Sequence, residues 1–190
     1  ICNLLDTNKP LIPVNWGTAF NQVYGGDEGK ATEQLAEVLR CLSGEFKFII
    51  YPLWEKDLPS CQNLVQQKVS AEVSLINRVP TTAELAFLFS KSMLTINLKL
   101  HANVFSAALG CPFISLAYRS KCFDFAQSMG CPEIAIALSS ENLKAQLLDK
   151  VAYLKKHRNH YARKIERKRD QYRQSLTTLT ENIFILAQDS

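Results

Sequence analysis

The stretch from Met93 to Tyr118 places a lysine and a histidine where a strand gives way to a helix. Its sequence, MLTINLKLHANVFSAALGCPFISLAY, begins and ends with short apolar runs, with small residues from Ala102 to Leu109 between them. This order predicts a strand, a helix and a second strand. Lys99 and His101 fall at the first junction and are the only cation and the only imidazole within this stretch.

This placement favours chemistry on an anion. In parallel α/β sheets, ligands bind at the carboxyl ends of strands, and a helix N-terminus attracts negative charge. We therefore predict that Lys99 and the neighbouring Leu100 bind an anionic substrate and that His101 transfers a proton, since imidazole titrates near neutral pH. The alternative is that Lys99 is a solvated charge and His101 a partly buried imidazole at the turn.

Further candidates follow other predicted strands. Asn15 and Trp16 end the first strand, Trp54 follows the second, and Tyr118 and Lys121 follow the strand after the Gly-Cys-Pro turn. We expect Asn15, Trp16, Tyr118 and Lys121 to contribute to substrate binding at the same edge of the sheet. A tryptophan at this edge would stack on a sugar, or would simply cover the end of the core.

The apolar runs are short and alternate with helical patterns, which predicts an α/β fold. This is typical of a Rossmann-like parallel sheet of about six strands with helices on both faces. Predicted strands cover 11–14, 46–51, 72–76, 93–96, 113–117 and 133–138, and predicted helices cover 31–42, 59–70, 83–90, 102–109 and 122–129. A long basic helix follows from residue 141.

Local signals mark several helix ends. Thr81 with Glu84 three residues later predicts a capped helix start. Gly110-Cys111-Pro112 and Gly130-Cys131-Pro132 each predict a helix end, because glycine suits the left-handed position and proline blocks further helix. Gly25-Gly26 lacks the G-x-G-x-x-G spacing, so it does not indicate a dinucleotide site.

Length and composition favour one domain. With 190 residues, 47% of them apolar, we predict a Rossmann-like body over 1–140 and a long helix and tail over 141–190 packed on it. No stretch is apolar enough to span a membrane or to act as a secretory signal, so we expect a cytoplasmic protein. The chain lacks an initiator Met and reads as a fragment of a longer one.

The cysteines and the charges are also informative. Six cysteines without a C-x-x-C pair favour a reduced protein over a disulfide framework and predict no metal site, with Cys41 and Cys111 in the core. The segment from Lys150 to Arg173 holds ten Lys/Arg and two acids, which gives it a net charge of +8. Since the whole chain has a net charge of +4, the other residues sum to −4. This helix is a solvated face, a contact for an anionic membrane surface or, least favoured, a nucleic-acid contact.

The order of these elements resembles the polysaccharide pyruvyl transferase family. The resemblance rests on Lys99-Leu100-His101, Gly110-Cys111-Pro112 and Tyr118-Arg119-Ser120-Lys121, and it is most specific from Glu84 to Met129. The chain departs from the family at Lys99, where the family has Arg. Lys keeps the charge and lacks the bidentate fork.

The resemblance implies the C-terminal half of a two-domain GT-B fold whose N-terminal half is missing from the chain. It implies a transferase without a cofactor that moves the pyruvyl group of phosphoenolpyruvate onto a glycan or lipid-linked sugar as a ketal. His101 would then be catalytic. Two alternatives remain: a GT-B-like glycosyltransferase or epimerase half that uses a nucleotide sugar, and a non-catalytic binding module on the same fold.

Overall fold

The computed structural model describes residues 8–19, 27–67 and 69–188. Six strands alternate with helices, as the sequence predicts. The strands are β1 (Leu11–Asn15), β2 (Lys47–Tyr51), β3 (Val73–Leu75), β4 (Thr95–Asn97), β5 (Phe113–Ala117) and β6 (Ala135–Ala137). The α-helices are α1 (Glu28–Leu42), α2 (Leu58–Gln66), α3 (Thr82–Ser90), α4 (Leu100–Ala108), α5 (Ser120–Ser128) and α6 (Leu143–Gln188), and the short 3₁₀ turns are η2 (Glu55–Asp57) and η3 (Pro132–Ile134).

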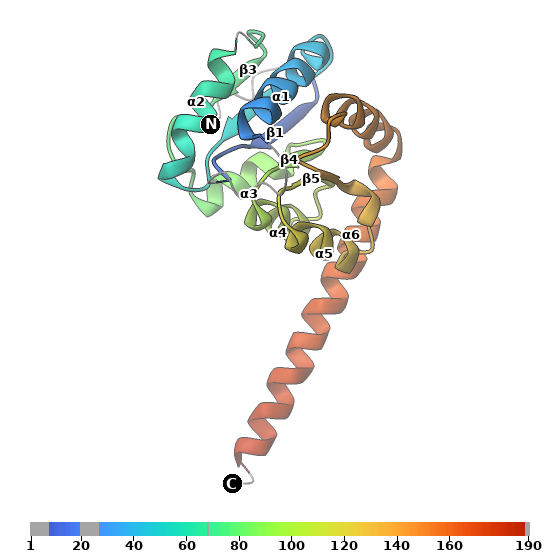
Figure 1. Cartoon of the computed structure of the whole chain (residues 1–190). Helices are drawn as coiled ribbons and strands as arrows, with labels where there is room; N and C mark the ends of the chain where they lie inside the picture. Colours follow the sequence, from blue (N-terminus) through green and yellow to red (C-terminus); the bar gives the residue numbers. More distant parts are fainter. Residues whose placement is uncertain (1–7, 20–26, 68, 189–190) are drawn as a thin grey trace.

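All six strands form one parallel sheet in the order β3-β2-β1-β4-β5-β6. The chain builds outward from β1 to β3, returns to place β4 beside β1, and then builds outward the other way (Figure 1). The strand order therefore reverses between β1 and β4, where Asn15 and Asn97 are register partners at the strand ends. In doubly wound sheets, this reversal opens a crevice at the carboxyl edge, the edge where the strands end.

Both faces of the sheet are buried, which confirms the reading of the short apolar strands. Side chains of a strand alternate between its faces, and in β2 Phe48 and Ile50 join one core cluster while Ile49 and Tyr51 join the other. The first cluster includes residues of α1, α2, α5 and α6, and the second is built mainly on α3. A strand with two buried faces needs a continuous apolar run.

The predicted helix ends are confirmed. Thr81 accepts a hydrogen bond from the Glu84 N–H at 3.2 Å, while the Glu84 carboxylate accepts one from the Thr81 N–H at 2.9 Å. Gly110 and Gly130 have φ of 68° and 72°, the left-handed conformation predicted for both. The pair Gly25-Gly26 lies outside the described residues.

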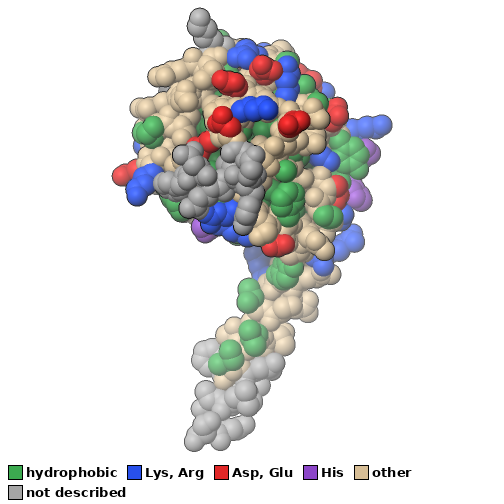
Figure 2. All heavy atoms as spheres, in the orientation of Figure 1, with side chains coloured by type: hydrophobic (Ala, Val, Ile, Leu, Met, Phe, Trp, Pro, Cys, Tyr) green, Lys and Arg blue, Asp and Glu red, His purple; other side chains and the backbone are tan. Residues whose placement is uncertain are grey.

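Helix α6 packs on the domain with its first half and projects with its second (Figure 1). His157 has non-helical φ and ψ of −109° and 17°, which kinks the helix. The inward face is buried through Ile165, whereas Leu176 and Leu179 on the projecting segment are exposed. Figure 2 shows this segment extending below the body. None of the helices in the described part of the chain combines the length and apolarity of a membrane span.

The two cysteines predicted for the core differ. Cys111 is buried, and burial raises the pKa of its thiol to about 12. The prediction is wrong for Cys41, which is exposed because Val38 and Leu39 take the inward face of α1. Cys41, Cys61, Cys111, Cys122 and Cys131 are all free thiols.

Replacement of Gly110 by Ala should destabilise the fold. A Cβ there would lie 2.8 Å from Glu166 Cγ, and an L-residue with left-handed φ costs about 1–2 kcal/mol. Urea denaturation should show a loss of that size. Gly44→Ala is the matched control, since a Cβ at Gly44 meets no atom within 4 Å. Equal effects of the two substitutions would contradict the assignment.

Candidate active site

A buried ion pair closes the carboxyl edge between β1 and β4. The Lys99 ammonium lies 3.1 Å from Asp57 Oδ1 and donates a hydrogen bond of 2.6 Å to the Thr18 carbonyl oxygen. The side chains of Lys99 and Asp57 are 7% and 0% exposed. The prediction that Lys99 projects into an open crevice is therefore wrong, because its ammonium is buried and paired with Asp57 from the loop after β2.

Asp57 also fixes the two loops beside it. Its Oδ1 accepts from the Thr18 N–H at 3.2 Å, and its Oδ2 accepts from the Trp54 N–H at 3.1 Å. Gly17 is required next to it, because a Cβ at Gly17 would lie 2.2 Å from Asp57 Oδ1. Asp57 is a site residue that was not predicted from the sequence. Two features of the sequence could have pointed to it: Asp57 lies in the loop after a predicted strand, and Gly17 follows the first strand.

Asn15 is buried and joins three strands. Its amide donates to the Tyr51 carbonyl oxygen at the end of β2, at 3.2 Å, and accepts from the Lys99 N–H after β4, at 3.0 Å. Both ends of the amide are thus used within the protein. Asn15 therefore holds the strand ends together, and the expectation that it faces a substrate is not met.

The two tryptophans have different positions. Trp16 is fully buried in the main core, so the expectation that it lies at the rim of the site is wrong. Trp54 is 48% exposed, and the Lys99 ammonium lies 4.8 Å from its ring centroid. Trp54 is thus an aromatic ring at this edge that solvent and a ligand can reach.

His101 lies in the first turn of α4 and is exposed, as a group that transfers protons to a substrate must be. Its imidazole makes no hydrogen bond to any described residue. Leu100, the first residue of α4, is half-buried beside it. The junction thus presents the imidazole to solvent while the lysine two residues earlier turns inward.

The turn between β5 and α5 carries a second group of cations. The Tyr118 ring is half-buried, and Arg119 and Lys121 each place their charged group 5.7 Å from its centroid. Arg119 was not among the predicted site residues, although it precedes α5 as Lys99 precedes α4. Since β4 and β5 are neighbours in the sheet, the starts of α4 and α5 lie at the same edge.

These two helix starts differ from those of α1 and α3. Helices α1 and α3 have acidic residues in the first turn and side-chain caps from Asp27 and Thr81. Helices α4 and α5 have neither, and basic residues occupy both N-cap positions, Lys99 and Arg119. A cation near a helix N-terminus opposes the dipole. Uncapped N–H groups beside a cation are suited to an anion.

A buried network of polar side chains connects α4 to the strands β4 and β2. Asn97 donates to Thr95 and Ser106 at 2.9 and 3.1 Å, and the Tyr51 hydroxyl donates to Asn97 at 3.3 Å. Burial raises the pKa of Tyr51 well above its usual value, so the hydroxyl stays protonated. These bonds fix the position of α4 on β4 and thus where His101 lies.

Comparison with known proteins identifies the fold. No family model and no curated protein sequence matches the chain. Among solved structures, the chain is similar to spinosyn rhamnosyltransferase SpnG, with 16% identity, a TM-score of 0.63 and coverage of 93% of this chain and 46% of that one. It is also similar to the UDP-GlcNAc 2-epimerase of Neisseria meningitidis bound to UDP-GlcNAc, with 16% identity, a TM-score of 0.53 and coverage of 86% and 40%.

A third similarity concerns an isolated domain. The C-terminal CMP-Kdo binding domain of WaaA from Acinetobacter baumannii has 13% identity and a TM-score of 0.53, with coverage of 87% of this chain and 91% of that one. The chain thus spans somewhat less than half the length of the rhamnosyltransferase and of the epimerase, and nearly all of this domain. The fold is that of the C-terminal half of a GT-B protein.

Loss of either partner of the buried ion pair should destabilise the protein strongly. Asp57→Ala or Lys99→Met leaves one charge buried without its partner, which costs about 3–5 kcal/mol. The double variant should lose clearly less than the sum of the two, since no uncompensated charge remains. Urea unfolding of the four proteins gives the coupling energy. Additivity within about 0.5 kcal/mol would mean that the two side chains are not coupled.

Proposed function

We propose that this chain is the donor-binding half of a sugar-modifying transferase and that its donor is phosphoenolpyruvate. The observation that carries the proposal is the pair of helix starts at the carboxyl edge, α4 and α5, which have basic N-cap residues, no side-chain cap and no acid in the first turn, unlike α1 and α3. The similarity of the sequence to pyruvyl transferases around Lys99, His101 and Lys121 supports this choice of donor.

In this proposal the positive groups divide between two tasks. Arg119, Lys121 and the N–H groups of α4 and α5 hold the carboxylate and phosphate of the donor. Lys99, neutralised by Asp57, positions the turn and sets where α4 begins. The sequence-based role of Lys99 as a direct ligand is thus replaced by a positioning role. Trp54 offers a face for a sugar ring.

His101 is the group proposed to move the proton. A sugar hydroxyl adds to C2 of phosphoenolpyruvate and releases its proton to water, while C3 takes a proton and becomes a methyl group. A second hydroxyl of the sugar then displaces phosphate at C2, and its proton leaves with inorganic phosphate. The product is a ketal. An exposed imidazole at the start of α4 would give the proton to C3, and such a transfer contributes on the order of 10²–10⁴ in rate.

A second candidate is a nucleotide-sugar donor, and the fold comparisons favour it. One similar structure holds UDP-GlcNAc and another is a CMP-Kdo binding domain. A nucleotide sugar would place its phosphates on the same helix starts. It would also need a partner for the ribose hydroxyls, and we assign no such group in this chain.

Thermal unfolding with ligands should separate the two donors. Phosphoenolpyruvate should raise the stability by RT ln(1 + [L]/Kd), about 2.7 kcal/mol at a hundredfold excess over Kd. The rise should disappear in Arg119→Gln/Lys121→Gln. UDP-GlcNAc, CMP-Kdo and inorganic phosphate are the comparison ligands. Stabilisation by nucleotide sugars alone would overturn the pyruvyl proposal in favour of the second candidate.

Loss of the exposed imidazole should reduce turnover without harming the fold. In the enzyme that contains this chain, we expect His101→Ala to lower kcat for ketal formation by about 10²–10⁴ and to change the stability by less than about 0.5 kcal/mol. His160→Ala is the matched control, an exposed histidine on α6. Unchanged turnover in His101→Ala would remove the acid–base role.

A further inference from the structure

The outer face of α6 carries a continuous line of basic side chains. Lys156, His160, Arg163 and Arg167 recur at intervals of three or four residues, and Lys164 is adjacent to Arg163, which places all five on one side of the helix. We call them the basic stripe. Their burial pattern agrees, since the buried positions Leu154, Tyr161 and Ile165 alternate with them and face the domain.

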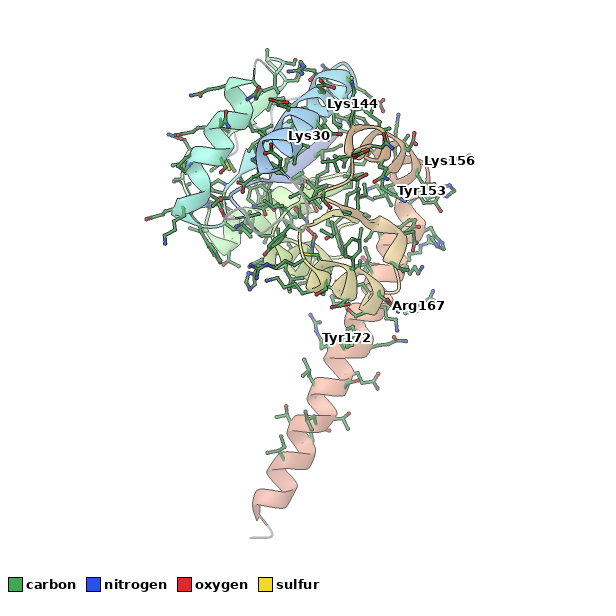
Figure 3. All side chains as sticks on the ribbon, in the orientation of Figure 1. Lys30, Lys144, Tyr153, Lys156, Arg167 and Tyr172 are labelled. Carbon is green, nitrogen blue, oxygen red and sulfur yellow. The ribbon has the colours of Figure 1, made fainter. Side chains whose placement is uncertain are left out.

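The figures show the same arrangement. In Figure 2, blue and purple side chains line the right-hand edge of the body, over the first half of α6. In Figure 3, Lys156 and Arg167 extend outward from this edge, with Tyr153 next to Lys156. Lys30, on α1, lies elsewhere on the body. The stripe therefore lies on the outer surface of the protein.

Most of the charge on the stripe is not neutralised within the domain. The Lys164 ammonium lies 3.8 Å from Glu133 Oε1. Lys156, Arg163 and Arg167 form no ion pair with any of the residues that the structure describes. This contrasts with Lys144 and Lys155 on the same helix, which pair with Glu37 and Glu45 of the domain.

The stripe also forms a shallow binding surface. His160, Arg163, Lys164 and Arg167 line a crevice of about 450 Å³ between their side chains. Tyr153, 45% exposed, continues the same face toward the start of the helix, and the Lys150 ammonium lies 5.6 Å from its ring centroid. Exposed tyrosine next to lysine and arginine is the composition of a surface that meets lipid headgroups.

We propose that the basic stripe docks the protein on an anionic membrane surface through lipid phosphates. The cations are exposed on one outward-facing side of α6 beside the exposed ring of Tyr153, a combination that suits lipid headgroups better than a nucleic-acid strand. Juxtamembrane polybasic segments act in this way through the negative surface potential. The proposal concerns a surface separate from the carboxyl edge and does not depend on the proposed reaction.

Co-sedimentation of the full chain with vesicles tests the proposal. Binding to vesicles of phosphatidylcholine with phosphatidylglycerol should exceed binding to phosphatidylcholine alone and should fall as salt rises. Each basic residue near the surface contributes about fivefold, so Lys156→Gln/Arg163→Gln/Arg167→Gln should weaken binding about a hundredfold. Circular dichroism should show that this variant keeps the helix, since the three side chains lie on the exposed face.

The matched control removes the same charge elsewhere. Lys30→Gln/Lys56→Gln/Lys91→Gln lowers the net charge equally at exposed positions off α6 and should leave binding within about twofold, since net charge alone acts weakly. Three results would overturn the proposal. These are no preference for the anionic vesicles, equal losses in the two triple variants, and tighter stripe-dependent binding of a single-stranded oligonucleotide than of vesicles.

Discussion

The ion pair between Asp57 and Lys99 determines the geometry of the carboxyl edge. The Asp57 carboxylate forms an ion pair with the ammonium of Lys99 in the β4–α4 turn. It also accepts hydrogen bonds from two backbone N–H groups, those of Thr18 after β1 and Trp54 after β2. These segments come from the two sides of the strand-order reversal, so the contact fixes the distance between those two sides. A buried pair is weak evidence for stability as such, yet loss of one partner is costly. The pair therefore restricts the edge to one arrangement.

With this arrangement fixed, the charge that a ligand meets comes from other groups. Lys99 is neutralised by Asp57, whereas Arg119, Lys121 and the dipoles of α4 and α5 contribute accessible positive charge among the described residues. The exposed imidazole of His101 lies on the same helix start that Lys99 positions. In the proposed function, positioning and proton transfer thus fall to two residues of one tripeptide, Lys99 and His101, because the first side chain is buried and the second is exposed.

Much of the fold follows from local sequence, because each βα unit carries its own signals. The strand Phe113–Ala117 has the predicted bounds, and Gly110 fixes the helix end before it. The site was less predictable. Alternation along β1 puts Trp16 on the face of Ile12 and Val14, so its burial follows from the period of two. The partner of Lys99 could not be predicted in this way, because Asp57 lies on another loop that only the tertiary fold brings close to Lys99.

Helix α6 shows how tertiary context determines burial. Its inward face continues with the same apolar spacing from Tyr161 and Ile165, which are buried, to Leu176 and Leu179, which are exposed. The sequence pattern is the same on both sides of the point where the domain ends, so pattern alone could not locate that point. Most helical stability in proteins comes from tertiary packing of one face of the helix. The projecting segment is helical because it extends a helix that the domain already holds, and the basic stripe, on the opposite face, stays exposed wherever the apolar face is covered.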